Sequence, residues 1–208
     1  MSIIQYLQLT EKENSMANKI VFIHGGPRKK GNTRAAAKIA IDAAKEQGAE
    51  VIEIDVTTLS FKEPGCISCY KCQNSDEYRC ALNDEVAEKV AGLPEYDVIV
   101  LATPLYWWSY TAQLKIFIDR MYSLSKVAAK DYKSALAGKK LGLLATAGGQ
   151  YENNLELLEA QWKKPADMLG CKFISCLFPE TTPHEGSLTG NSSAVEKAKE
   201  FGRLLASA

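Results

Sequence analysis

The sequence predicts an α/β protein built on one parallel sheet, and three observations lead to that prediction. Five short apolar stretches alternate along the chain with five stretches whose apolar residues recur at helical spacing. Regular alternation of strand and helix is typical of a parallel sheet with helices on both faces. Three loops that follow apolar stretches also carry unusual chemistry, as expected where ligands bind beyond the carboxyl ends of parallel strands.

Each expected element has its own local signal. The predicted strands are apolar runs bounded by glycine, proline or charged residues, and they cover residues 19–25, 51–56, 96–104, 139–149 and 171–178. The predicted helices show apolar positions at helical spacing, and they cover residues 33–47, 83–93, 109–124, 151–169 and 193–207. Gly48 stops the first helix, and Pro165 is a candidate kink in the fourth.

Composition limits the classes of function. The chain has 208 residues, of which 46% are hydrophobic, enough for one buried core. Lys plus Arg equals Asp plus Glu, 25 each, so the chain lacks the basic footprint of a nucleic-acid binder. No apolar run approaches the roughly 20 residues that cross a bilayer. With no secretory signal in view, we expect a cytoplasmic protein that binds neither nucleic acid nor membrane.

Residues 1–18 fit the rest poorly, and a second methionine, Met16, precedes the first strand. We expect residues 1–18 to be an N-terminal extension and residues 19–208 to form one domain. The alternative is a short arm that packs on a neighbouring molecule through Ile3, Ile4 and Leu7.

The first loop, GGPRKKGNT at residues 25–33, almost matches the triphosphate-binding pattern G-x-x-x-x-G-K-[ST]. Gly26, Gly31 and Thr33 are in place, but Asn32 replaces the lysine that balances triphosphate charge. The N-terminus of the following helix and the fork of Arg28 still suit a phosphate. A monophosphate needs less counter-charge, so the loop predicts a monophosphate site.

The second and third loops add a place for a flat ring. TPLYWW contains Tyr106, Trp107 and Trp108 after the stiff Pro104, and ATAGGQY offers small residues with free backbone donors. Ordinary core or interface aromatics are the alternative for the second loop. A monophosphate site beside a planar-ring site is the pattern of flavin mononucleotide (FMN).

Four cysteines, Cys66, Cys69, Cys72 and Cys80, are separated by two, two and seven residues. Such spacing lets one loop wrap a metal centre, so a [4Fe–4S] cluster, zinc, or free and redox-active thiols are all open. The acidic residues inside the last gap argue against a cluster, because they would add negative charge beside thiolates that are already negative. The other two, Cys171 and Cys176, are expected to be buried apolar residues.

The stretches GGPRKKGNT, CISCYKC, TPLYWWSYTAQLKIFIDR and ATAGG occur in this order, and they resemble the flavodoxin-fold NAD(P)H-dependent FMN reductase family. They are most similar to its cysteine-bearing branch, which includes the iron-sulfur flavoproteins. The resemblance runs from about residue 19 to the C-terminus. It implies a flavodoxin-like three-layer sandwich with strand order 2-1-3-4-5, noncovalent FMN, NAD(P)H as electron donor, and a homodimer or tetramer. Gly26 stands where the family usually has serine, which removes one hydroxyl donor.

The resemblance also implies residue roles. The FMN phosphate would contact Arg28, Asn32 and Thr33, with the backbone near Gly26. The ring would lie against Pro104, Leu105, Tyr106 and Trp107, and against Thr146, Ala147, Gly148 and Gly149. The compact motif of the iron-sulfur flavoproteins would place a [4Fe–4S] cluster on Cys66, Cys69, Cys72 and Cys80. No catalytic side chain is expected, because the flavin carries the chemistry.

Three functions follow as hypotheses. The first is an FMN-dependent NAD(P)H oxidoreductase that reduces a small acceptor, such as a quinone, flavin, nitro or azo compound. The second is an iron-sulfur flavoprotein that carries electrons between protein partners. The third is a cysteine-based metal or interaction module on a degenerate scaffold.

Overall fold

The computed structural model describes residues 17–127 and 129–207, and the expected N-terminal extension lies outside them except for its last two residues. Of those two, Asn18 donates a side-chain hydrogen bond to the carbonyl of Ala206 at 3.0 Å, close to the C-terminal end of the chain. The first strand begins at the next residue, as the sequence predicts.

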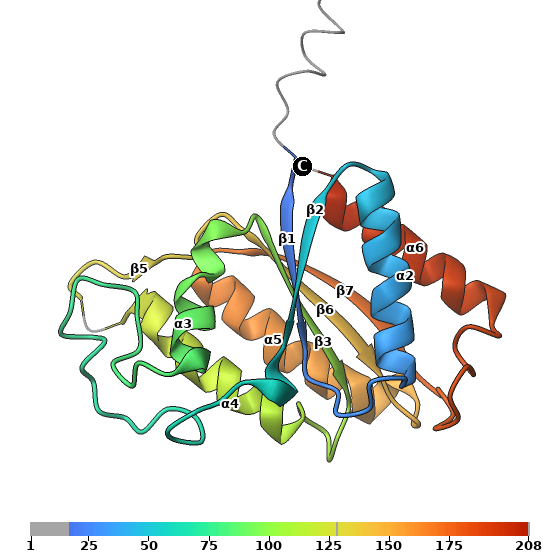
Figure 1. Ribbon diagram of the computed structural model, residues 1–208, viewed down its shortest axis with the longest axis horizontal. Coiled ribbons are helices and arrows are strands. Elements are labelled where there is room, and N and C mark those ends of the chain that lie inside the picture. Colours follow the sequence, from blue (N-terminus) through green and yellow to red (C-terminus); the bar gives the residue numbers. More distant parts are fainter. Residues whose placement is uncertain (1–16, 128, 208) are drawn as a thin grey trace, which may run out of the picture.

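The core of the molecule is a five-stranded parallel sheet (Figure 1). Its strands, in spatial order, are β2 (Glu50–Asp55), β1 (Lys19–His24), β3 (Val98–Pro104), β6 (Lys140–Thr146) and β7 (Lys172–Phe178). Every neighbouring pair is parallel. This order equals the expected 2-1-3-4-5 when the five sheet strands are counted along the chain, so the predicted topology is confirmed.

Helices cover both faces of the sheet, which makes the three layers (Figure 1). One apolar cluster joins the sheet to α2 (Asn32–Glu46) and α6 (Ser192–Ala206). A second cluster joins the opposite face to α3 (Glu85–Ala91), α4 (Ala112–Arg120) and α5 (Glu156–Leu169). The central strands are buried on both sides, which explains why their sequences read as unbroken apolar runs.

The pair α2 and α6 packs at very short range because Gly202 has no side chain. A Cβ atom added at Gly202 would lie 2.1 Å from the carbonyl oxygen of Ala40 on α2. The many alanines of α2 serve the same close approach, with Ala36, Ala37 and Ala40 all fully buried.

Three local features differ from the sequence-based expectation. Helix α4 begins later than predicted, because Thr111 caps it by accepting a hydrogen bond from the amide of Leu114. Helix α5 also begins later, because the turn Tyr151–Leu155 contains Asn153 at φ +54°, and it then runs without a break through Pro165. A small antiparallel pair, β4 (Ser125–Lys126) and β5 (Lys133–Ser134), was not predicted.

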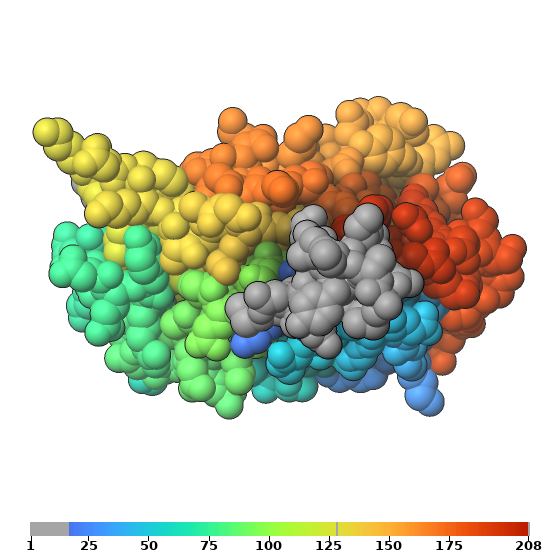
Figure 2. Space-filling view, turned by 90° about the horizontal axis from the view of Figure 1, so that it is seen from above, coloured from blue at the N-terminus to red at the C-terminus, as the bar shows by residue number. Residues whose placement is uncertain are grey.

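The remaining short elements are single turns of tighter helix. They are Val56–Thr58, Leu93–Glu95 and Met121–Leu124. Residues 59–84, which carry the four spaced cysteines and are called the cysteine loop below, follow the first of these turns. In Figure 2 the cysteine loop and the β4–β5 segment form one end of the molecule, away from α2 and α6.

Candidate functional site

A cleft of about 470 Å³ opens where the carboxyl ends of β1, β3, β6 and β7 meet. It contains most of the predicted cofactor residues, drawn from all three signalled loops. The lining consists of Gly26, Pro27, Arg28, Gly31, Asn32, Thr33, Pro104, Leu105, Tyr106, Thr146, Ala147, Gly148, Thr181, Thr182, Pro183 and Glu185. The structure therefore brings these loops together at the switch point of the sheet, where such folds bind ligands.

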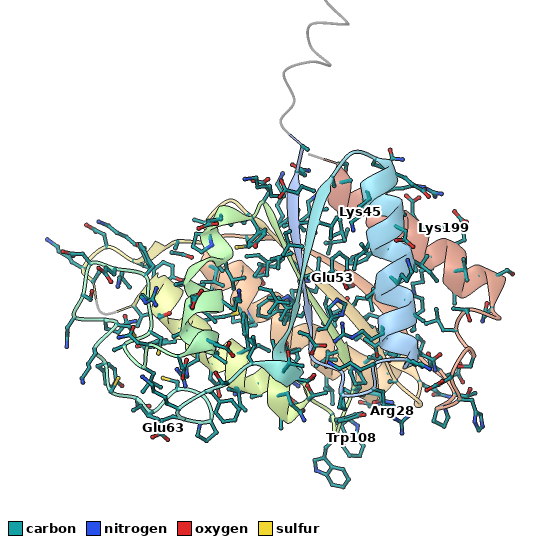
Figure 3. The ribbon with its side chains drawn as sticks, viewed as in Figure 1. Arg28, Lys45, Glu53, Glu63, Trp108 and Lys199 are labelled. Atoms are coloured by element: carbon teal, nitrogen blue, oxygen red, sulfur yellow. The ribbon has the colours of Figure 1, made fainter. Side chains whose placement is uncertain are left out.

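One end of the cleft is the N-terminus of α2. Gly31 precedes the helix and supplies no side-chain cap, and the first turn holds no acidic residue. The first backbone N–H groups of α2 are thus left without a side-chain acceptor, and the helix dipole adds positive potential there. Arg28 is an exposed residue of the loop before α2, and it lies at the carboxyl ends of the strands, as Trp108 does (Figure 3).

The side chain of Asn32 has a different set of partners from those predicted. Its amide donates to the carbonyls of Thr182 (2.8 Å) and His184 (3.1 Å), and its oxygen accepts from the amide of Leu188 (3.3 Å). All three partners belong to the loop after β7. The Asn32 side chain thus fixes one wall of the cleft, and its contact with a phosphate stays a prediction.

Thr33 also makes a bond within the protein. Its hydroxyl lies 2.6 Å from the hydroxyl of Thr146, and both residues are buried. This contact joins the first turn of α2 to the last residue of β6. A phosphate contact from the Thr33 hydroxyl would have to share it with Thr146.

Behind the first loop lies a cluster of charges centred on Asp55, the last residue of β2. Lys29 and Arg34 both form ion pairs with the Asp55 carboxylate, and Lys29 also reaches the Thr57 hydroxyl at 3.0 Å. Burial alone would raise the pKa of Asp55, yet hydrogen bonds from Lys29 and Thr57 lower that pKa to about 2. Lys29 remains exposed despite this ion pair, as does Lys30.

His24, at the end of β1, is a structural residue. It is 1% exposed, and its Nε2 lies 2.9 Å from a carboxylate oxygen of Glu53. Burial, and then the positive charge of Arg34, lower the pKa of His24 despite that bond. The other histidine, His184, is exposed on the loop after β7.

The apolar wall of the cleft consists of Pro104, Leu105 and Tyr106, and it ends in a tight turn. Tyr106 and Ser109 exchange two backbone hydrogen bonds of 3.0 Å, with Trp107 and Trp108 between them. Both tryptophans have positive φ, 49° and 58°, a region that bulky residues rarely adopt.

Two predicted ring-contact residues, Trp107 and Gly149, do not line the cleft. Trp107 is 89% exposed and meets the ring of Trp108 edge-on at 5.4 Å between centroids. Gly149 faces the Asn154 side chain instead. Their contact with a cofactor stays a prediction.

The loop after β7 contributes lining residues that sequence reasoning did not name. They are Thr181, Thr182, Pro183 and Glu185. The only signal was the length of this loop, which is typical of functional or mobile segments.

The four spaced cysteines line a second, much smaller pocket of about 20 Å³. Cys66 and Cys69 are exposed, Cys80 is half-buried and Cys72 is buried. Part of its wall comes from the end of α4 and the turn after it, through Asp119, Arg120, Tyr122 and Ser123, and the pocket shares no lining residue with the large cleft. In the described ranges, no three His, Cys, Asp or Glu side chains are close enough to hold a single metal ion. A four-iron cluster takes one thiolate on each iron and so spaces the thiolates more widely than one ion does.

Of the remaining cysteines, Cys171 precedes β7 and Cys176 lies within it. Burial raises the pKa of Cys176 to about 12, and that of Cys171 to about 11. Cys176 belongs to the core under α6, and Cys171 is half-buried with its thiol directed to the carbonyl of Leu136 at 2.9 Å. The expected burial is confirmed for Cys176, whereas Cys171 is only half-buried.

The sheet order and the cleft at its switch point define a flavodoxin-like α/β protein. The sequence profile of the NADPH-dependent FMN reductases matches residues 18–171, and the chain belongs to that family.

Individual proteins show the same relationship. An iron-sulfur flavoprotein of Methanosarcina thermophila is 31% identical over 139 residues, which cover 66% of this chain and 67% of that protein. One from Methanocaldococcus jannaschii is 37% identical over 103 residues, covering 49% and 51%. The chain thus spans about half to two thirds of these curated relatives. In structure, an NAD(P)H:quinone oxidoreductase from Methanothermobacter marburgensis superimposes with a TM-score of 0.71 at 19% identity, covering 91% of this chain and 100% of that one.

Within residues 17–127 and 129–207, no helix is both long enough and apolar enough to cross a bilayer.

Proposed function

We propose that this protein is an FMN-dependent NAD(P)H oxidoreductase that passes electrons through noncovalent FMN to a small acceptor, such as a quinone, flavin, nitro or azo compound. The observation that carries the proposal is the cleft that joins an uncapped helix N-terminus to an apolar wall. Membership in the FMN reductase family supports it.

The residues of the cleft fit FMN in size and in chemistry. A volume of about 470 Å³ lies within the range of small-molecule and cofactor sites, roughly 300–1,000 Å³. A Cβ atom at Gly26 would lie 3.2 Å from Cδ of Pro104, so a side chain there would crowd the space between the phosphate loop and the ring wall. The cleft offers one anion site, which suits a mononucleotide better than a dinucleotide.

The chain's own residues divide the work of binding. The backbone of α2 and the guanidinium of Arg28 hold the phosphate, while Pro104, Leu105 and Tyr106 support the ring. When bound, FMN supplies the hydride and electron chemistry, so no protein acid or nucleophile is needed. NAD(P)H and the acceptor would use the same open side of the cleft in turn, which gives ping-pong kinetics.

The test is to purify the protein, release its cofactor and identify it by mass, and then follow NADH and NADPH oxidation with quinone and azo acceptors. Stoichiometric FMN and turnover with either donor are expected. Recovery of FAD, or an apoprotein that fails to bind FMN, would overturn the proposal.

A second function is favoured by the cysteine pocket. Four cysteines from one loop face one small volume, and curated relatives are named iron-sulfur flavoproteins. We propose as the alternative an iron-sulfur flavoprotein in which Cys66, Cys69, Cys72 and Cys80 bind a [4Fe–4S] cluster and pass electrons to protein partners. An anaerobic absorption spectrum separates the candidates. Flavin alone supports the first function, and flavin together with a cluster supports the second. A spectrum with no flavin and no cluster supports the third hypothesis, a degenerate module.

Assembly and location are part of the proposal. We expect a homodimer or tetramer in the cytoplasm, acting on small molecules or redox proteins. Size-exclusion chromatography with light scattering tests the assembly, and a monomer would contradict it.

A further inference from the structure

Two buried cationic side chains donate hydrogen bonds to the cysteine loop. Lys126 comes from β4 and Arg120 from the end of α4, and their side chains are 8% and 1% exposed as whole residues. Both lie at least 36 residues along the chain from the loop residues that they bind. They are not among the cysteines or cleft residues assigned above.

The ammonium group of Lys126 is bound entirely by the cysteine loop. Its ammonium donates to the carbonyls of Cys72 (2.6 Å), Ser75 (2.6 Å) and Glu77 (2.7 Å), which uses all three of its donors. It also lies 4.9 Å from the centroid of the Tyr78 ring. Among the described residues, no carboxylate lies within ion-pair distance of Lys126.

Arg120 fastens the two ends of the same loop. It donates to the carbonyls of Glu63 (2.7 Å) and Gly65 at the start of the loop. At the other end it reaches the sulfur of Cys80 at 3.4 Å and the carboxylate of Asp84 at 3.2 Å. The guanidinium thus pairs with one carboxylate and also contacts the sulfur of Cys80, a candidate cluster ligand.

The charge around the pocket is the reverse of what the loop sequence suggests. The acidic side chains inside the last cysteine gap, Asp76 and Glu77, are exposed, so water screens them. The two cations are buried: Arg120 lines the pocket and pairs with Asp84, whereas Lys126 lies behind Cys72, bonded to its carbonyl. Asp119, which also lines the pocket, pairs with Lys115. A buried ammonium held by carbonyl dipoles alone costs free energy, and a nearby anion would offset that cost.

We infer that Lys126 and Arg120 form a cationic seat that fixes the cysteine loop and offsets the negative charge of a thiolate-bound iron-sulfur cluster. This inference rests on the alternative function above. A [4Fe–4S] cluster bound by four thiolates is a net anion, and neighbouring charges and hydrogen bonds tune its potential. The seat explains how a loop with acidic residues can accept such a centre.

Gln73 supports the seat from beside Cys72. Its amide donates to the carbonyls of Tyr122 (3.3 Å) and Ser125 (2.9 Å), and its oxygen accepts from the amide of Val127 (3.0 Å). The segment that carries Lys126 and the loop that carries the cysteines are therefore bonded in both directions. Removing the lysine should disturb this attachment locally and leave the large cleft intact.

The test compares Lys126→Met with Lys71→Met in full-length protein made and reconstituted without oxygen. Lys71 lies in the same loop, is exposed and makes no ion pair among the described residues, so it controls for a simple loss of charge. Lys126→Gln keeps hydrogen-bond donors without the charge, and it covers the case in which the methionine variant does not fold. The readouts are iron and sulfide per chain, the cluster's reduction potential, FMN content and the melting temperature.

We expect Lys126→Met to retain iron roughly 10- to 100-fold more weakly, a loss typical of outer-shell residues, with FMN content unchanged. Any cluster in Lys126→Gln should have a lower potential, because lost positive charge disfavours the reduced form. Lys71→Met should match the wild type. Wild-type iron content and potential in both Lys126 variants, or equal effects at Lys71, would overturn the inference alone. Wild-type protein that takes up no iron would remove the alternative function together with this inference.

Discussion

Arg28 is the charged residue of the first loop that lines the cleft. Lys29 is bound to Asp55, whereas Arg28 lines the cleft and makes no ion pair among the described residues. We expect Arg28→Ala to weaken FMN binding about ten- to hundredfold, the effect of losing a charge-assisted hydrogen bond of roughly 1.5–3 kcal/mol. Fluorescence titration of apoprotein with FMN measures it.

Lys30→Ala is the matched control for Arg28, because it removes one exposed charge from the same loop. Equal weakening in both variants would mean that the loop attracts FMN through its overall field and not through a specific contact. Lys29→Ala is less clean, since it also strips a partner from Asp55.

Asn32 affects the cleft through the loop after β7. Asn32→Ala would remove one donor from each of the carbonyls of Thr182 and His184, and it would leave the buried amide of Leu188 without its acceptor, a loss of roughly 1–3 kcal/mol. We expect a lower melting temperature and faster hydrogen exchange at residues 182–188. Ser187→Ala, which removes a more exposed bond of 3.2 Å to Thr182, should have little effect. Unchanged exchange in Asn32→Ala would show that the loop is held by other contacts.

The turn between β3 and α4 is strained at both of its central residues. Type I′ geometry favours Asn-Gly, yet this turn carries Trp107 and Trp108 at positive φ. Bonds from Trp108 to Asn153 (3.1 Å) and from Gln161 to Trp108 (3.0 Å) hold it in place. Strain of this kind is often maintained at functional sites.

The contribution of the Trp107 ring can be separated from that strain. We expect Trp107→Gly to raise stability by about 1 kcal/mol, because glycine adopts positive φ freely, while turnover with NAD(P)H falls. Trp107→Ala keeps the strain and should lose the same turnover without the gain in stability. If both variants turn over normally, the exposed ring has no part in the reaction.

The last residue of β2 links three elements, and that link should depend on pH. In the folded protein the pKa of Asp55 is about 2, below its ordinary value of 3.8. Its contribution to stability is therefore complete above pH 3.8 and is lost as pH falls toward 2. We expect Asp55→Asn to be less stable than the wild type near neutral pH, with the difference shrinking across that acidic window. Urea unfolding at several pH values measures it, and a difference independent of pH would mean that lost packing is responsible.

The elements could be predicted where their signal is local. Buried strands such as β3 read as apolar runs, and the alanines of α2 recur at helical spacing. The β4–β5 pair could not be predicted, since two-residue strands have no periodicity. The late start of α5 depends on the backbone of Asn153, which nothing in the helical pattern around it reveals.

At the scale of the whole molecule, the sequence predicted the loops that line the cleft better than the long-range contacts that hold loops in place. Three cleft loops carry glycine, proline or aromatic signals of their own. The contacts of Asn32 with the loop after β7, and those of Lys126 with the cysteine loop, join residues far apart in the chain. No spacing rule reports such pairs, because they arise only when the sheet has assembled.

The large cleft and the cysteine pocket form two separate sites on one fold, and they should fail separately. They share no lining residue, and the body of α4 connects them: its cap Thr111 bonds to the carbonyl of Gly25 at 2.7 Å, while Arg120 at its other end faces Cys80. We expect substitution of any of the four cysteines by serine to abolish the cluster while FMN stays bound, because the four thiolates act as one unit.

Iron, acid-labile sulfide and FMN per chain, measured on anaerobic protein, test this separation. The reciprocal variant, Arg28→Ala, should lose FMN while iron remains. About four irons and four sulfides in the wild type would support the cluster, and none, with titratable thiols, would leave an FMN reductase whose cysteines shape a loop. One zinc per chain would contradict both versions. Loss of FMN in the cysteine variants would mean that α4 transmits changes between the sites, so the two should then be treated as one cooperative unit.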